Sequence, residues 1–152
     1  MAPRTGCAHD GYRREIVESI RTVWNAVQIV SSKPRQLILV VEDDEGMRHA
    51  IRRLLEIEGF EAGLFDSAEA LLEAGVAPDA KCLVLDIQLP GMSGFDLQRH
   101  LEAAGAARPV IFITAHDLPR IRERALANAD SYLVKPFLSE TLVDAVTRAL
   151  AK

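Results

Sequence analysis

The chain has 152 residues, of which 49% are apolar and 26% charged, a composition typical of one globular domain that excludes a disordered chain. Its formal charge of -4 divides into +3 over residues 1–36, from six basic and three acidic residues, and -7 over residues 37–152, so we expect no direct nucleic-acid partner for the longer part. The cysteines, Cys7 and Cys82, fit neither a disulfide framework nor a zinc site, and no apolar stretch approaches the ~20 residues of a membrane span, so we expect a soluble, cytoplasmic protein without membrane contact.

The first 36 residues are predicted to form a tail and one helix, separate from a domain in residues 37–152. Residues 1–11 have no apolar periodicity and are expected to be a loose tail. An amphipathic helix is predicted from Tyr12 to Val30, and Pro34 follows its end. The apolar positions of this helix recur every three or four residues: Ile16, Ile20, Val23, Val27 and Val30. We expect this stripe to contact a partner or a second copy of the chain; packing on the chain's own domain and a mistaken start site are the alternatives.

After residue 36, short apolar runs alternate with helical patterns, which is typical of a parallel sheet covered by helices on both faces. The predicted strands are Leu37–Val41, Glu61–Phe65, Lys81–Leu85, Pro109–Thr114 and Ser131–Val134. The predicted helices lie around residues 47–58, 67–72, 95–101, 118–127 and 138–150. The sequence therefore predicts an α/β protein with a doubly wound, five-stranded parallel sheet and an extra N-terminal helix.

Acidic, hydroxyl and basic residues stand at the carboxyl ends of four predicted strands. Glu42 and Asp43 come after the first strand and Asp86 after the third, while Thr114 ends the fourth and Lys135 follows the fifth. Ligands of open parallel sheets bind at these carboxyl ends. A cluster of carboxylates suits Mg²⁺, which keeps coordination positions open for phosphoryl oxygens. We therefore predict a phosphoryl-transfer site, with Asp86 as the nucleophile, Lys135 as a cation and Thr114 as a hydroxyl donor.

In this order, the residues make the sequence similar to response regulator receiver domains of two-component signalling, from about Leu37 to Leu150. The resemblance rests on the segment Leu37-Ile-Leu-Val-Val-Glu-Asp-Asp and on the segment Leu83-Val-Leu-Asp-Ile-Gln-Leu-Pro-Gly-Met-Ser-Gly94, together with Thr114 and Lys135. It implies the flavodoxin-like strand order 2-1-3-4-5.

The resemblance also implies a set of metal ligands. Asp43 and Asp86 would bind Mg²⁺ directly, Gln88 would bind it through its main-chain carbonyl, and Glu42 would bind it through a water molecule. Glutamate at position 42 departs from the family's usual aspartate by one methylene, which bears on the geometry of the metal site.

A second implied set of residues carries the switch between two states. Thr114 and Lys135 would contact the phosphoryl group on Asp86, and Tyr132 matches the family's aromatic residue that changes rotamer in the switch. The resemblance further implies a cis peptide between Lys135 and Pro136. Asn128 stands where a glycine is usual before the fifth strand.

The function implied is that of a stand-alone response regulator, not an enzyme. A histidine kinase or a phosphotransfer protein would donate its phosphoryl group to Asp86, and the output would be a contact with a downstream protein, because the printed sequence ends two residues after Leu150. The expected output face is the helix 118–127, the strand 131–134 and the helix 138–150. This face, or the N-terminal helix, could also form a dimer.

Two alternatives remain open at this point. One is a Mg²⁺-dependent phosphohydrolase with an aspartate nucleophile, similar to the haloacid dehalogenase family, although Gln88 stands where such enzymes carry a second acid. The other is a docking module of the same fold that is never phosphorylated. Phosphorylation of Asp86 by a small acyl phosphate separates the three hypotheses.

Overall fold

The structure, a computed structural model, describes residues 9–31 and 34–152. It contains two compact units, Met1–Pro34 and Arg35–Lys152. The first unit holds α1 (His9–Ser31), which begins three residues before the predicted start. The prediction of a tail up to residue 11 was therefore wrong for residues 9–11, because a helix can begin before the residues that show apolar periodicity. Residues 1–8, with Cys7, and residues 32–33 lie outside the described part.

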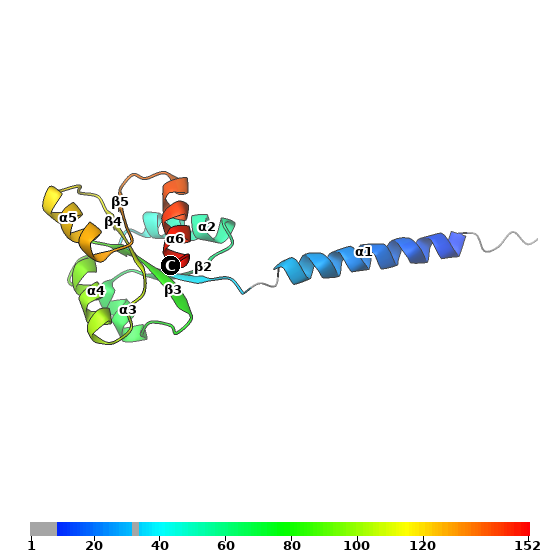
Figure 1. The fold of residues 1–152 in the computed structure, drawn as a ribbon, viewed down its shortest axis with the longest axis horizontal. Helices are drawn as coiled ribbons and strands as arrows, with labels where there is room; N and C mark the ends of the chain where they lie inside the picture. Colours follow the sequence, from blue (N-terminus) through cyan, green and yellow to red (C-terminus); the bar gives the residue numbers. More distant parts are fainter. Residues whose placement is uncertain (1–8, 32–33) are drawn as a thin grey trace, which may run out of the picture. The chain divides into compact units, whose positions relative to one another are not determined.

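The second unit is built on a five-stranded sheet, β1 (Leu37–Val41), β2 (Glu61–Phe65), β3 (Ala80–Asp86), β4 (Val110–Thr114) and β5 (Ser131–Val134). Every neighbouring pair is parallel, and the order is β2-β1-β3-β4-β5, which confirms the predicted topology (Figure 1). Val41 pairs with Leu85, and Thr114 pairs with Val134. The chain therefore leaves these strands at nearly the same level, on one edge of the sheet.

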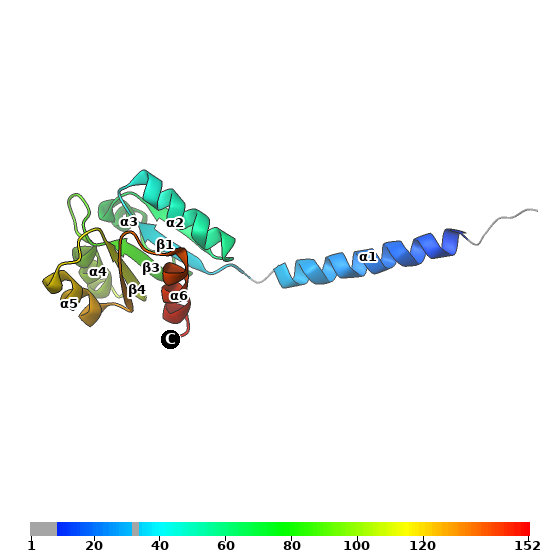
Figure 2. The same cartoon turned by 90° about the horizontal axis from the view of Figure 1, so that it is seen from above.

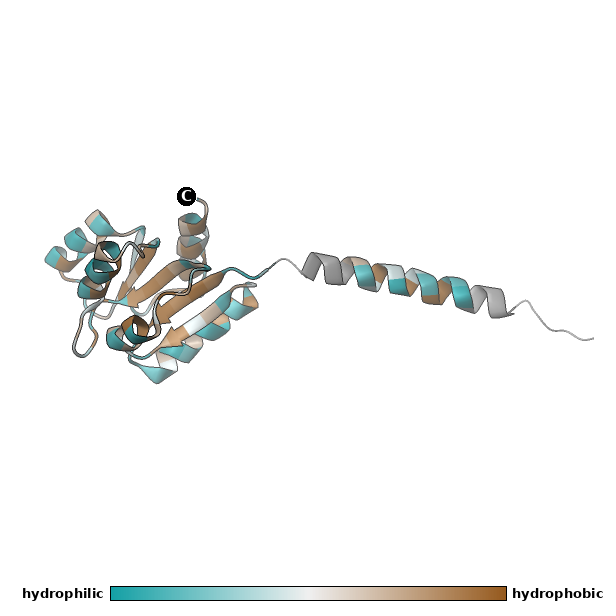
Figure 3. Ribbon diagram, turned by 90° about the horizontal axis from the view of Figure 1, so that it is seen from below, coloured by the Kyte–Doolittle hydropathy of each residue, from teal (hydrophilic) through white to brown (hydrophobic). Residues whose placement is uncertain are grey.

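Five helices cover the sheet: α2 (Glu45–Ile57), α3 (Ala68–Ala74), α4 (Gly94–Ala103), α5 (Pro119–Asn128) and α6 (Ser139–Leu150). Helices α2 and α6 pack on one face, and α3, α4 and α5 pack on the other (Figures 1 and 2). In β1, Ile38 and Val40 face the first layer, whereas Leu39 and Val41 face the second. Strand β1, residues 82–85 of β3 and residues 110–113 of β4 are continuous apolar runs, as expected of strands that are covered on both faces, and the sheet is largely brown in Figure 3.

Local caps fix where three of these helices begin. The side chain of Asp44 accepts a hydrogen bond from the N–H of Met47, and those of Ser67 and Ser93 cap α3 and α4 in the same way. Helix α3 ends at Ala74, two residues beyond its predicted end, and is followed by Gly75, whose φ is 78°. Among the described residues, we find no helix with the length and hydropathy that crossing a membrane requires.

Candidate functional site

Three carboxylates meet at the edge where β1 and β3 end. Glu42 and Asp86 are buried, with 1% and 4% of their surface exposed, whereas Asp43 is exposed. One oxygen from each of the three lies within 4.8 Å of the other two. The predicted acidic cluster is therefore assembled by the fold, and its negative charge requires a nearby cation.

Lys135 supplies a positive charge to the two buried carboxylates. Its Nζ lies 2.6 Å from Oε2 of Glu42 and 2.9 Å from Oδ2 of Asp86. Its main-chain N–H donates to the carbonyl of Thr114 over 2.8 Å, which extends the pairing of β5 with β4. The peptide bond to Pro136 is cis, as the resemblance implied. The lysine follows β5 and thus reaches the acids from the other side of β4, the strand that lies between β3 and β5.

Burial dominates the electrostatics of this cluster. It raises the pKa of Glu42 to about 7, with a further contribution from the charge of Asp86, although hydrogen bonds from Lys135 and the Asp44 N–H act in the opposite direction. Burial also opposes the charge of Lys135, but the hydrogen bonds to Glu42 and Asp86 outweigh it, so the pKa of Lys135 lies above its ordinary value. The lysine is therefore charged at neutral pH, while Glu42 is close to titrating.

This arrangement makes the stability of the metal-free protein depend on pH. Between the ordinary pKa of 4.5 and the folded-state pKa of about 7, the folded protein keeps a proton on Glu42 that the unfolded chain has released. The free energy of unfolding is thus expected to fall as the pH rises through this window, by on the order of 3 kcal/mol. Urea titrations in chelator should show this slope, and Glu42→Gln should remove most of it; an equal slope in both proteins would contradict the assignment.

Arg48 is a neighbour of the acidic cluster that the sequence analysis missed. Its guanidinium donates to the main-chain carbonyls of Glu42, over 2.9 Å, and Asp43, over 3.3 Å. The N–H of Asp44 donates to Oε1 of Glu42 over 3.1 Å. Hydrogen bonds to main-chain groups of residues 42–44 therefore hold in place the loop that carries Glu42 and Asp43. Because Arg48 lies in the first turn after the Asp44 cap, its proximity to this loop follows from helical geometry and could have been predicted.

The loop after β3 holds the carboxylate of Asp86 in place. The N–H of Gln88, an exposed residue, donates to Oδ1 of Asp86 over 2.9 Å. At Gly94, a Cβ atom would come within 2.3 Å of the Asp86 carbonyl, so only glycine allows this close return of the chain. The carboxylate of Glu69 in α3 accepts the N–H of Met92 over 2.7 Å, which lowers the pKa of Glu69. No local pattern predicted the role of Glu69, because the contact joins distant parts of the chain.

Thr114 and Tyr132 are not part of the carboxylate cluster. The buried Thr114 hydroxyl accepts the N–H of His116 over 3.1 Å and contacts the His116 carbonyl at 3.3 Å. The half-buried Tyr132 donates its hydroxyl to Oδ1 of Asp117 over 3.3 Å, and partial burial with the Asp117 charge raises the pKa of Tyr132. Asp117 is also bound by Arg122. Of the predicted residues, the fold thus joins Glu42, Asp43, Asp86 and Lys135. It places Thr114 at the end of β4 and Tyr132 in the neighbouring strand β5.

The donor set fits a hard divalent cation. All three candidate side-chain ligands offer carboxylate oxygens, and no sulfur or imidazole ligand belongs to the cluster. The two buried acids share one lysine, so the cluster retains negative charge that a cation would balance. An aspartate that is held by Gln88 and Lys135, beside a place for a cation, is suited to accept a phosphoryl group.

Comparison with known proteins agrees with this geometry. The family model described as "Response regulator receiver domain" matches residues 38–147. Nodulation protein W of Bradyrhizobium diazoefficiens is 39% identical over 116 residues, which cover 76% of this chain and 51% of that protein. The chain spans about half the length of the curated relatives that it matches.

Solved structures show the same likeness. The low-resolution structure of the response regulator StyR is 41% identical, with a TM-score of 0.69, and the match covers 78% of this chain and 60% of that one. The BeF3-activated DrrB receiver domain is 27% identical, with a TM-score of 0.70, and the match covers 78% of this chain and all of that one.

Proposed function

The chain belongs to the response regulator receiver domain family, whose members are the phosphoacceptors of two-component signalling, and from this premise we propose that Asp86 is the residue that accepts the phosphoryl group. The observation that carries the proposal is the contact of the Asp86 carboxylate with Lys135, within a cluster of three carboxylates at one sheet edge. Asp86 is the member of this cluster that lies on the family's phosphoacceptor motif.

Mg²⁺ is the cation that we propose for the cluster. Asp43 and Asp86 would bind it directly, Gln88 would bind it through its main-chain carbonyl, and Glu42 would bind it through a water molecule. The cation supplies positive charge to the oxygens of the phosphoryl group. Because Glu42 is already bonded to Lys135 and to the N–H of Asp44, an indirect contact suits it better than a direct one.

In the proposed transfer, an oxygen of Asp86 forms a bond to the phosphorus atom of the donor. The bond between phosphorus and the donor's histidine nitrogen breaks, and the electron pair of that bond returns to the imidazole. Lys135 moves from Oδ2 of Asp86 to an oxygen of the phosphoryl group, so its charge stays paired throughout. The product is an acyl phosphate on Asp86, at the carboxyl end of β3.

The proposed switch begins when the phosphoryl group recruits the Thr114 hydroxyl. To donate to a phosphoryl oxygen, this hydroxyl must give up the hydrogen bond that it donates to the His116 carbonyl, which loosens the start of the loop that leads to Asp117. Tyr132 is bonded to Asp117, so movement of the loop releases its hydroxyl. The charge added at Asp86 thereby changes the surface of α5 and β5.

We propose that the partners are proteins. A histidine kinase or a phosphotransfer protein would approach the sheet edge at Asp86, and a downstream protein would read the face formed by α5, β5 and α6. The proposed receiver domain is residues 37–152, acts in the cytoplasm and is a regulator, not an enzyme. Residues 1–36 would form a separate segment, and Ile16, Ile20 and Val23 of α1, all exposed, would mediate dimer formation.

The experiment that tests the proposal is phosphorylation by acetyl phosphate, followed by intact mass spectrometry and peptide mapping. We expect the mass of one phosphoryl group to be added in Mg²⁺, with the modified residue mapped to Asp86, and no addition in chelator. No mass change in Mg²⁺ would favour the docking module. Steady release of phosphate from a small phosphate ester, without a stable adduct, would favour the phosphohydrolase.

A further inference from the structure

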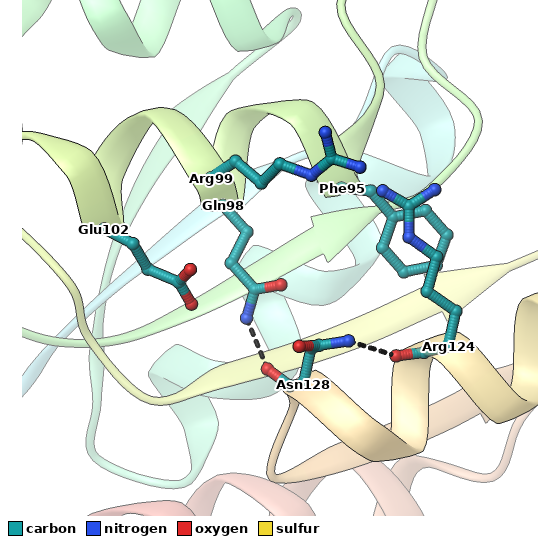
Figure 4. A pocket seen from close by; sticks show the side chains of 6 residues that line it. All are labelled: Phe95, Gln98, Arg99, Glu102, Arg124 and Asn128. Carbon is teal, nitrogen blue, oxygen red and sulfur yellow. Dashed lines mark hydrogen bonds between the residues drawn. The ribbon is translucent and has the colours of Figure 1, made fainter.

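A cavity of about 260 Å³ lies between α4 and α5 and has no part in the proposed phosphorylation site. Figure 4 shows the side chains that line it: Phe95, Gln98, Arg99, Glu102, Arg124 and Asn128. The first four belong to α4 and the last two to α5. The cavity therefore spans two helices that pack on the same face of the sheet.

Contacts between the helices keep the walls of the cavity in place. The Arg124 guanidinium lies over the ring of Phe95, with its Cζ 4.2 Å from the ring centroid, and this ring packs edge-on against Phe112. The largely buried side chain of Gln98 donates to the main-chain carbonyl of Asn128. The Asn128 amide donates to the Arg124 carbonyl over 2.8 Å. The orientation of Arg124 is thus restricted before any ligand binds, which lowers the entropic cost of binding.

Two guanidinium groups of the cavity lack an acidic partner. Figure 4 shows Arg99 and Arg124 extending toward the Phe95 end, whereas Glu102 lies at the other end, beyond Gln98. Within residues 9–31 and 34–152, neither arginine forms an ion pair, in contrast to Arg122, which pairs with Asp117. Because residues 37–152 carry a formal charge of -7, this end of the cavity is a local positive site on an acidic domain.

The size and charge of the cavity indicate its occupant. It is at or below the lower limit of sites for drug-sized ligands, roughly 300 Å³, but it can hold the end of one side chain. The planar forks of Arg99 and Arg124 match the geometry of a carboxylate. Glu102 at the opposite wall and the C-terminal end of α5 at Asn128 both repel anions, and they disfavour a doubly charged phosphate more than a singly charged carboxylate.

We propose that this cavity binds a carboxylate side chain, aspartate or glutamate, of an acidic partner protein, with Arg99 and Arg124 as its ligands. Since the two arginines come from different helices, the occupant joins α4 to α5. The proposal does not depend on phosphorylation of Asp86, so failure of one leaves the other intact.

The test uses the full chain and a soluble peptide of alternating glutamate and alanine, with the matching glutamine peptide as its control. We expect saturable shifts of the Arg99 and Arg124 Nε–H signals in NMR titrations with the glutamate peptide and none with the glutamine peptide. Arg99→Gln and Arg124→Gln should each weaken binding about tenfold or more. Arg120→Gln, an exposed arginine one turn away on α5 and outside the cavity, should change it by less than about twofold.

Three results would overturn the proposal. Equal weakening by all three substitutions would show that the peptide responds only to the overall charge of α5. Tighter binding of inorganic phosphate than of the glutamate peptide at the same two arginines would assign the cavity to phosphate groups instead. Absence of saturable shifts at Arg99 and Arg124 would show that the cavity does not bind carboxylates. Because both arginines are exposed, either variant should remain folded, and circular dichroism verifies this.

Discussion

Asp86→Asn is expected to abolish phosphorylation by acetyl phosphate in Mg²⁺ while leaving the domain folded. An amide has nearly the same shape as the carboxylate, but it neither attacks phosphorus nor binds Mg²⁺ well. The substitution also changes the charge balance, because Lys135 then faces only Glu42 in place of two acids. In chelator, the variant should therefore be at least as stable as the natural chain, while the stabilisation that Mg²⁺ gives to the natural chain should largely disappear.

The matched control for this substitution is Asp44→Asn. Asp44 is an exposed acid next to the cluster, where it caps α2 through the N–H of Met47. Asparagine is an equally good capping residue, so this variant should gain the phosphoryl mass at close to the natural rate. Intact mass spectrometry over a time course measures both. A phosphoryl adduct of full size on Asp86→Asn would show that another residue is the acceptor.

Much of the fold was predictable because the sequence patterns are strong where the sheet is buried on both faces. The apolar runs of β1, β3 and β4 and the periodicity of α2 and α6 each point to one structure. The strand order came from the family resemblance and not from periodicity, because alternating strands and helices are compatible with several orders. The start of α1 was misplaced by three residues and the end of α3 by two, since apolar periodicity marks a helix without fixing its terminal residues.

The acidic cluster was predictable for a topological reason. Residues that directly follow parallel strands must lie at one edge, so Glu42, Asp86 and Lys135 converge once the strands are correctly placed. Contacts made by side chains on helices were not predictable in this way. Glu69 reaches Met92 through the packing of α3 beside the loop after β3, and Arg124 reaches Phe95 through the packing of α5 on α4. Such contacts depend on how the helices lie on the sheet, which a single sequence does not specify.

Lys135→Met is expected to destabilise the domain by about 3–5 kcal/mol in chelator, because it leaves two buried carboxylates without their shared cation. Lys135 is itself largely buried, with 15% of its side chain exposed, and it forms the shortest ion pair of the cluster, 2.6 Å to Glu42. Mg²⁺ should restore part of the lost stability, since a cation that binds only the folded state replaces some of the missing charge. Urea titrations with chelator and with Mg²⁺ measure both effects.

Lys152→Met provides the comparison that separates a buried charge from an exposed one. Lys152 pairs with Asp130 at the same distance of 2.6 Å, but 67% of its side chain is exposed, so its loss should cost less than about 1 kcal/mol and should not respond to Mg²⁺. If Lys135→Met were as stable as Lys152→Met in chelator, protonation of Glu42, whose pKa is already raised to about 7, would be enough to relieve the charge of the cluster. Lys135 could then not be the cation that keeps two acids together at this edge of the sheet.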